Sequence, residues 1–160
     1  QTNIPGLPPL EINERPSFSD YKRSAITRFL SKASTRIKAY QPNCIISAAV
    51  KPNLNNARNT FGQEWDVWLA GGYIDWAVPM NYSMNLSTFD KNIQIMKQSL
   101  PKKYIARVIM GIATYNQNAN SAGKKIYHTG INDFSGISIF SYTVFKGEPS
   151  YAKQLIKYFQ

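Results

Sequence analysis

Short apolar runs alternate with segments of helical periodicity along the chain, and this alternation constrains the fold more than any other feature of the sequence. Four strands are predicted from the apolar runs, at about residues 44–50, 73–82, 105–113 and 136–142. Helices are predicted at about residues 20–40, 62–70, 87–100 and 121–129, and from Pro149 onwards. Strands that alternate with helices build a parallel sheet with right-handed crossovers, buried on at least one face.

Capping residues, prolines and glycines mark the expected helix ends. Ser17-Phe18-Ser19-Asp20 offers capping oxygens to the first helix, and Gln41-Pro42-Asn43 ends that helix. Ser87-Thr88-Phe89-Asp90 is interpreted as a second capping box, and Gly71-Gly72 as a left-handed helix end. Residues 1–19 are rich in proline and polar residues, so they are expected to form a loop, followed by one α/β domain over residues 20–160.

Two architectures fit this order of elements: an open doubly wound sheet, or half of an eight-stranded (β/α)8 barrel. Turns from helix to strand are short, whereas the segments that follow strands are longer, such as the polar loop expected at residues 51–62. Ligands bind at the carboxyl ends of the strands in both architectures. No glycine-rich phosphate loop follows any predicted strand, which counts against a nucleotide-binding sheet and favours the barrel.

Composition narrows the classes of function. The 160 residues are 43% hydrophobic, which suits one domain with a core, and no apolar run is long enough to predict a membrane span. The chain has one cysteine, Cys44, and one histidine, His128, which excludes a disulfide framework and a zinc site of several cysteines and histidines. No metal or cofactor is therefore predicted.

A formal net charge of +10 raises the question of an anionic partner. Much of the positive charge falls on the first predicted helix, where it is interleaved with apolar residues at helical spacing. A solvated basic face is favoured over a nucleic-acid interface, because no DNA- or RNA-binding motif accompanies it. The nucleic-acid alternative predicts an affinity that falls steeply with salt.

The second predicted strand ends in Pro79-Met80-Asn81-Tyr82-Ser83, which places an amide and a phenol at a carboxyl end. This pair suits sugar hydroxyls or an acetamido group, although Tyr82 could instead only pack in the barrel mouth. Further candidates for the same rim follow the other strands: Lys51, Asn53, Tyr115 and Tyr142.

Glycoside hydrolysis usually needs two carboxyl groups that flank the scissile bond, and the sequence offers no convincing pair. Asp75 lies near the start of the second predicted strand and Asp133 in the loop before the fourth, both at the edge away from the ligand. Asp20 and Asp90 are explained as caps, and Glu64 by the helix dipole. Glu11 and Glu14 lie in the opening loop, where a minor substrate contact is conceivable. Catalytic residues thus stay unassigned. Structural roles are predicted for four other residues: a helix end for His128 and the core for Trp65, Trp68 and Trp76.

The chain resembles the glycosyl-hydrolase-like proteins related to glycoside hydrolase family ten, which are bacterial TIM-barrel hydrolases. The resemblance spans about residues 18–160 and is carried by the following segments: Ser47 to Val50, Gly62 to Leu69, Gly72 to Tyr82, Met110 to Ile112 and Gly136 to Tyr142. It implies that the four strands are the fifth to eighth of a barrel. Met80-Asn81-Tyr82 also resembles the sixth-strand Met-x-Tyr segment of chitinase-type barrels, where the tyrosine steadies an N-acetyl group.

The family's Asp-Gly-(Ile/Val)-His-(Phe/Leu)-Asp segment, on its fourth strand, has no counterpart here. The resemblance therefore implies the C-terminal half of a barrel, which contacts a polysaccharide or cell-wall glycan while the catalytic acids lie upstream of Gln1 in a missing N-terminal half. It also implies an exported, extracytoplasmic protein. The alternative is a non-catalytic carbohydrate-binding or scaffold module.

Overall fold

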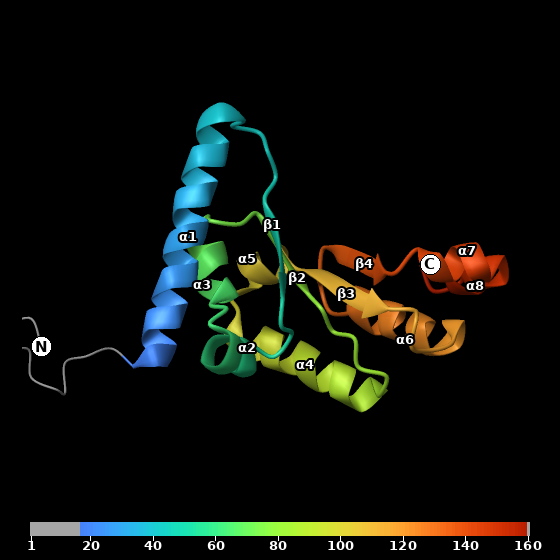
Figure 1. Cartoon of the computed structure of the whole chain (residues 1–160). Helices are drawn as coiled ribbons and strands as arrows, with labels where there is room; N and C mark the ends of the chain where they lie inside the picture. Colours follow the sequence, from blue (N-terminus) through green and yellow to red (C-terminus); the bar gives the residue numbers. More distant parts are fainter. Residues whose placement is uncertain (1–16, 160) are drawn as a thin grey trace, which may run out of the picture.

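The computed structural model describes residues 17–159, in which helices alternate with four short parallel strands (Figure 1). Most of the predicted opening loop, with Glu11 and Glu14, lies outside the described residues. In chain order the elements are α1 (Phe18–Tyr40), β1 (Ser47–Val50), α2 (Leu54–Phe61), α3 (Trp65–Ala70), β2 (Trp76–Pro79), α4 (Leu86–Ser99), α5 (Lys102–Ile105), β3 (Ile109–Ala113), α6 (Ala119–Gly130), β4 (Gly136–Phe140), α7 (Thr143–Gly147) and α8 (Pro149–Ile156).

The four strands lie side by side in the order of the sequence. β1 pairs with β2 in parallel, and β3 pairs with β4 in parallel. Two parallel bridges, from Ala77 to Val108 and from Met80 to Gly111, join β2 to β3. Gly111 fits this junction because a Cβ at its position would lie 2.7 Å from the Pro79 carbonyl oxygen. The predicted mixed α/β fold with a parallel sheet is confirmed, whereas the four described strands do not themselves close a barrel.

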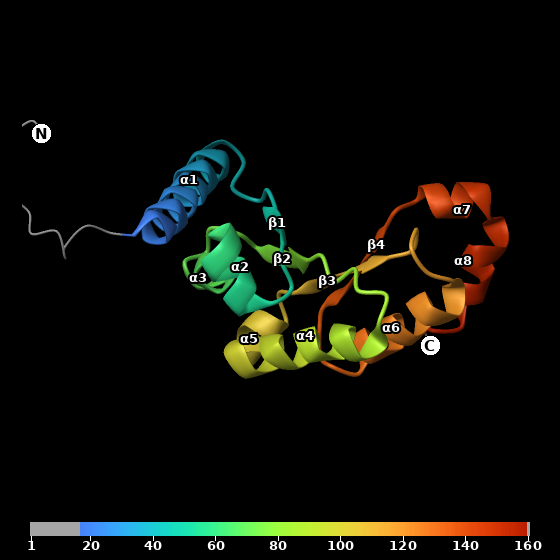
Figure 2. The same cartoon turned by 60° about the horizontal axis from the view of Figure 1, so that its bottom comes forward.

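Helices cover one face of the sheet. Figure 2 shows α4, α5 and α6 along the same side of the strands. From this layer Phe89 and Ile93 of α4 and Ile126 of α6 are buried, and they belong to one apolar cluster with Met110 and Ile112 of β3. Burial of apolar area against the sheet is thus the main force that holds the strands and helices together.

The opposite face of the sheet is open within the described residues. Paired residues of parallel strands point to the same face, so the register puts Ser47 and Ala49 of β1 on one face with Trp76 and Val78 of β2. These β1 residues are exposed, and Trp76 and Val78 are only half-buried. The prediction that Trp76 is a buried core residue is therefore wrong, because it begins its strand on the face that no helix covers.

Helix α1 begins as predicted. The Ser17 side chain accepts from the Asp20 N–H, and the Asp20 carboxylate accepts from the Ser17 N–H at 3.2 Å, which completes a capping box. The predicted apolar stripe divides into two, however: Ile26 and Leu30 pack against the core, whereas Phe29 and other aromatic residues face solvent. The basic side chains of α1 that are exposed are Arg28, Lys32 and Arg36.

Several predicted boundaries move for local reasons. The segment expected as a polar loop at residues 51–62 contains α2, whose first turn is capped by the Asn53 side chain. Strand β2 is shorter than the predicted span of residues 73–82, because the N–H groups of Tyr73 and Ile74 bond to the Trp68 carbonyl at the end of α3. The predicted third strand begins late, at Ile109, since Ile105 ends α5 and a turn follows it.

Polar contacts fix the amino-terminal edge of the sheet. Asp75 accepts from Lys38 Nζ and from the Ile46 N–H, both at 2.8 Å, which links α1, β1 and β2. The hydrogen bond from Lys38 is the main reason that the pKa of Asp75 is lowered. Arg107 donates to the Asp75 and Leu69 carbonyls at 2.9 and 3.0 Å, and also to the Ile74 carbonyl. This edge is therefore structural, as expected for the side of the sheet away from ligands.

Candidate functional site

Three aromatic rings meet at the carboxyl-terminal edge of the sheet. Tyr82 follows β2, Tyr115 follows β3 and Phe140 ends β4, and we call these three side chains the aromatic trio. The Tyr82 and Phe140 rings are stacked, with centroids 5.7 Å apart and an interplanar angle of 8°. Tyr115 meets both of them edge-on, at 6.4 Å from Tyr82 and 6.0 Å from Phe140. Three neighbouring strands thus bring their ends into one aromatic surface.

The aromatic trio consists of one half-buried ring, that of Tyr82, and two exposed rings. Tyr115 is 56% exposed and Phe140 is 53% exposed, so large parts of both rings face solvent. Tyr82 is half-buried between them, and burial, followed by the neighbouring Tyr115, raises the pKa of its phenol. The Tyr82 hydroxyl is therefore protonated at neutral pH, and it makes no hydrogen bond to another described residue. It can donate one hydrogen bond to a ligand.

Asn81, the other leading candidate from the sequence, lies below the rim. Its side chain is 1% exposed, and Asn81 Nδ2 donates to the Phe89 carbonyl of α4 at 3.1 Å. Asn81 Oδ1 accepts from Asn92 Nδ2 at 2.9 Å. Both ends of the amide are used within the protein, so in this arrangement Asn81 anchors the end of β2 to α4 and supports the neighbouring Tyr82.

The candidates that follow β1 are engaged with α2 and α3. Asn53 is the N-cap of α2, and its Oδ1 accepts from the Asn56 N–H at 3.0 Å. Lys51 Nζ lies 4.6 Å from the centroid of the Phe61 ring. The Lys51 carbonyl accepts from Trp65 Nε1 at 3.1 Å. The structure thus gives Asn53 a capping role and leaves Lys51 half-buried beside α2, apart from the aromatic trio.

Tyr142 is the most exposed of the predicted rim residues, at 76%. Its ring faces Phe145 of α7, with centroids 6.3 Å apart, and it makes no aromatic contact with the described trio. The structure thus brings Tyr82 and Tyr115 together, whereas Tyr142 lies two residues after Phe140 as the N-cap of α7.

Phe140 and Lys125 are site residues that the sequence analysis missed. Phe140 falls within the strand predicted at residues 136–142 and ends the observed strand β4; an aromatic residue near the carboxyl end of a predicted strand is a signal that could have singled it out. Lys125 follows Lys124 on a predicted helix, where a pair of lysines is typical of a solvated face. It is nevertheless 1% exposed, and its ammonium group contacts the loops that carry Tyr82 and Tyr115. Sequence offers no sign of that burial.

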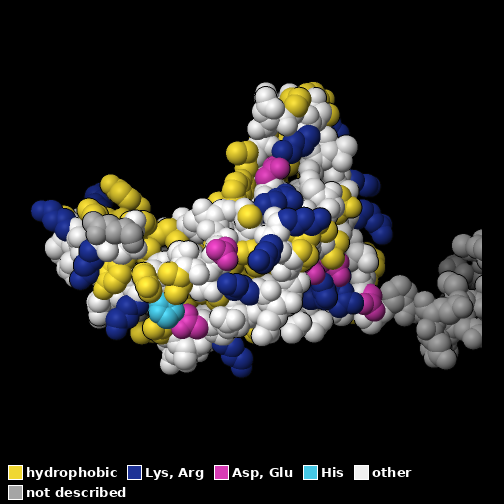
Figure 3. Space-filling model, turned by 180° about the vertical axis from the view of Figure 1, so that it is seen from behind, with side chains coloured by type: hydrophobic (Ala, Val, Ile, Leu, Met, Phe, Trp, Pro, Cys, Tyr) yellow, Lys and Arg dark blue, Asp and Glu magenta, His cyan; other side chains and the backbone are white. Residues whose placement is uncertain are grey.

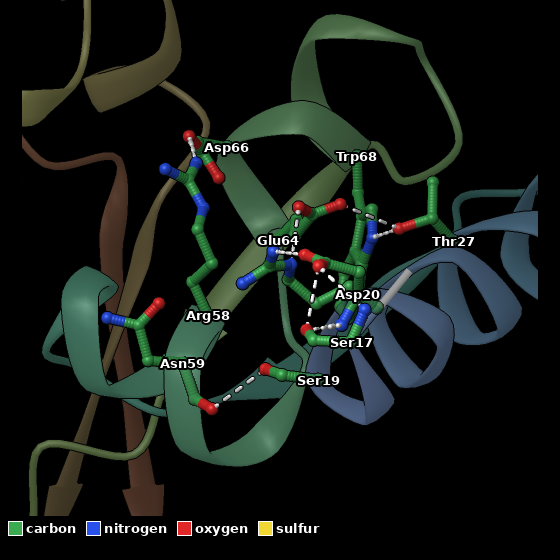
Figure 4. Close-up of polar contacts among 10 residues, drawn as sticks. Ser17, Ser19, Asp20, Thr27, Arg58, Asn59, Glu64, Asp66 and Trp68 are labelled. Atoms are coloured by element: carbon green, nitrogen blue, oxygen red, sulfur yellow. Dashed lines mark hydrogen bonds and ion pairs between the residues drawn. The ribbon is translucent and has the colours of Figure 1, made fainter. Parts of the chain in front are cut away.

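Carboxylates near the start of α1 serve the packing of helices. Figure 4 shows Glu64 facing α1, where it lies 3.5 Å from Arg23 Nε and 3.4 Å from Thr27 Oγ1. The same Thr27 hydroxyl accepts from Trp68 Nε1 at 2.8 Å. Asp66 pairs with Arg58 in the same group of contacts. Trp68 is buried here, and Trp65 is buried beside the core, which confirms the predicted core role of both.

Asp90 has a different partner from the one that the sequence predicted. The N-cap of α4 is Asn85, whose side chain accepts from the Ser87 and Thr88 N–H groups. Asp90 instead lies 2.8 Å from His128 Nδ1 on α6. The predicted capping role of Asp90 is therefore wrong, because the N-cap lies two residues earlier than the predicted Ser87. His128 lies in the last turn of its helix, as predicted.

Other binding features lie away from the trio. A cavity of about 440 Å³ opens beside α6 and the start of β4, with mostly apolar walls that include Ile126, Ile137 and Phe159.

No three His, Cys, Asp or Glu side chains gather into a metal site within residues 17–159. Over the same residues, no helix has the length and apolarity that crossing a bilayer requires. On the face shown in Figure 3, Lys and Arg side chains are spread along the molecule and form no single patch.

Comparison with known proteins places the chain in a family. No curated protein matches the chain. A family of proteins described as glycosyl hydrolase-like 10 matches residues 6–129, which include β1, β2, β3 and two members of the aromatic trio. The matched segment covers more than half of the chain, and its strands place polar and aromatic residues at their carboxyl ends. On this evidence the chain belongs to the glycosyl hydrolase-like 10 family.

Proposed function

We propose that the chain forms the substrate-binding part of a glycoside hydrolase, with the aromatic trio as its sugar-binding surface. Membership of a glycosyl hydrolase-like family supports a role in carbohydrate chemistry. The observation that carries the proposal is the contact of Tyr82, Tyr115 and Phe140 at the carboxyl ends of three adjacent parallel strands. Ligands of parallel α/β folds bind at this edge.

Sugar rings suit such a surface for two physical reasons. The C–H groups on one face of a pyranose carry slight positive charge and pack against the negative face of an aromatic ring. The Tyr82 hydroxyl can also donate to a sugar oxygen from a fixed position, since its ring is held between Phe140 and Tyr115. Asn81 has a supporting role in this proposal, because its amide already binds α4.

The same proposal includes a complete eight-stranded barrel. The four strands follow one another in parallel order, one face is covered by helices, and residues 17–159 leave the other face open. Exposed Ser47, Ala49 and Ser138 on the open face are small enough for the interior of a closed barrel. The partner that closes it is a second set of four strands, the N-terminal half, which supplies the catalytic acids.

The proposed substrate is a polysaccharide or cell-wall glycan outside the cytoplasm. The net charge of +10 is compatible with an anionic glycan. A non-catalytic carbohydrate-binding module is the second candidate. It is favoured by the partners that five described carboxylates already have within the protein: Asp20, Glu64, Asp66 and Asp75 each pair with a lysine or an arginine, and Asp90 lies beside His128.

The test uses the intact protein and its Tyr82 variants. Tyr82→Phe keeps the ring and removes the hydroxyl, so we expect kcat on a cleaved glycan to fall while the fold is retained. Tyr82→Ala also removes the ring, and we expect oligosaccharide binding to weaken by roughly tenfold. Tyr127→Ala is the matched control, because Tyr127 is exposed on α6 beside the apolar cavity.

Each result has a separate meaning. Release of reducing ends from a glycan supports the hydrolase, and binding without hydrolysis supports the non-catalytic module. If Tyr82→Ala and Tyr127→Ala bind the glycan as well as the unaltered protein, the aromatic trio is not the sugar-binding surface.

A further inference from the structure

Lys125 is a buried cation beside the proposed site. It lies on α6, and only 1% of the residue is exposed, although its neighbour Lys124 faces solvent. Burial lowers the pKa of the Lys125 ammonium group. Removing an ammonium group from water is costly unless acceptors replace the water. Its contacts therefore show what compensates for that cost.

The ammonium group has three donors, and the structure supplies three acceptors. Lys125 Nζ donates to the Ser83 carbonyl at 2.6 Å and to the Met84 carbonyl at 3.1 Å. It also donates to Gln117 Oε1. Ser83 and Met84 belong to the loop after β2, and Gln117 belongs to the loop after β3. Lys125 thus joins the two loops that carry Tyr82 and Tyr115.

Two further contacts reinforce this link. Asn116 Nδ2 donates to the Tyr82 carbonyl at 3.1 Å, which ties the loops directly to each other. The Tyr151 hydroxyl of α8 donates to the Gln117 carbonyl at 2.9 Å, which fixes the loop after β3 to α8. The backbone at Tyr82 is thus fixed by the bond from Asn116 to its own carbonyl and by the bond from Lys125 to the next residue, Ser83. Tyr115 is fixed in the same way, because it directly precedes Asn116 in the chain.

Replacing Lys125 by an apolar residue removes the cost of burying a charge, but it also leaves three acceptors without their donor. Phe89 lies 5.9 Å from Lys125 Nζ, so an unbranched apolar side chain such as methionine would meet an apolar neighbour. What the apolar residue cannot do is hold three oxygens of two separate loops.

We propose that Lys125 is a positioning residue that keeps the rings of Tyr82 and Tyr115 in register with Phe140 for a bound sugar. The proposal rests on the function proposed above. It adds that the geometry of the aromatic surface depends on a side chain that the sugar never touches.

The experiment compares Lys125→Met with Lys124→Met in the intact protein, since both variants remove one positive charge from α6. Ring-proton NMR shifts of Tyr82 and Phe140 report their stacking, and oligosaccharide titration reports binding. In Lys125→Met we expect the ring-proton shifts to move to the values of unstacked rings and the affinity for the oligosaccharide to fall by roughly five- to tenfold. In Lys124→Met we expect both the ring-proton shifts and the affinity to stay unchanged. Asn116→Ala breaks the direct bond between the two loops while Lys125 keeps its three acceptors, and we expect a smaller change in the same direction.

The two proposals fail in different ways. If the ring-proton shifts are unchanged in both Lys125→Met and Asn116→Ala, the positioning role is overturned, whether or not the affinity for the glycan changes. Lost ring stacking in a protein that binds no glycan even before substitution supports the positioning role and overturns the proposed function. If Lys125→Met does not fold, the Asn116→Ala shifts decide the question.

Discussion

Replacing Asn81 by alanine separates a structural role from a ligand-binding role for this residue. The buried Asn81 amide donates to the Phe89 carbonyl and accepts from Asn92. Alanine removes both hydrogen bonds, each worth about 1 kcal/mol, so the free energy of unfolding is expected to fall by about 2 kcal/mol. With a urea dependence of about 2 kcal/mol per molar, the unfolding midpoint should fall by about 1 M.

The assay is equilibrium urea unfolding of the intact protein at 25 °C, followed by far-UV circular dichroism. Asn92→Ala is the matched variant, because it removes only the bond that Asn92 donates and should cost about 1 kcal/mol. The double variant should lose about 1 kcal/mol less than the sum of the two single losses, since both remove the same bond. An unchanged midpoint in Asn81→Ala, together with lost glycan binding, would refute this reasoning and place the amide at the ligand.

Two further predictions concern charge and packing. The pKa of the Asp75 carboxyl is lowered, chiefly by the hydrogen bond from Lys38. The ionised carboxylate therefore stabilises the fold fully above the pKa of the unfolded state, which is about 3.9, and this stabilisation is lost as the pH falls through the lower pKa of the folded state. Asp75→Asn should therefore flatten the acid side of a plot of stability against pH, and an unchanged slope would contradict the ion pair. Gly123→Ala should destabilise the protein by about 1–3 kcal/mol, because its Cβ would lie 2.1 Å from ring atoms of Tyr158. Gly130→Ala, with open space around the new Cβ, should leave the melting temperature equal or slightly higher; equal losses in both variants would argue against the Tyr158 contact.

The order of elements could be predicted from the sequence because local signals specify it. Pro42 and Gly72 mark the ends of helices, and the apolar runs around Val50 and Ile112 mark strands. Short-range chemistry also identified the capping box at Ser17. The missed α2 has a local cause too, since an N-cap such as Asn53 followed by polar residues has the composition of a loop.

The site was predicted less completely because its parts meet only through tertiary contacts. Tyr82 and Tyr115 could be placed at strand ends, but the stacking of Phe140 on Tyr82 depends on the order and register of β2, β3 and β4. The burial of Lys125 depends on carbonyl groups about forty residues earlier in the chain. Periodicity within one helix carries no information about such partners.

The free edges of the sheet affect how the protein should be handled. β1 and β4 each have one edge without a strand partner among the described residues, and all strands run in the same direction. The free edge of β4 in one copy can therefore pair in parallel with β1 of another, a head-to-tail contact that either closes into a ring or continues as an open array. We therefore expect a preparation of this chain to be a mixture of assembly states whose proportions change with dilution. Its apparent melting temperature should be measured over a range of protein concentrations, because a value from one concentration combines folding with assembly.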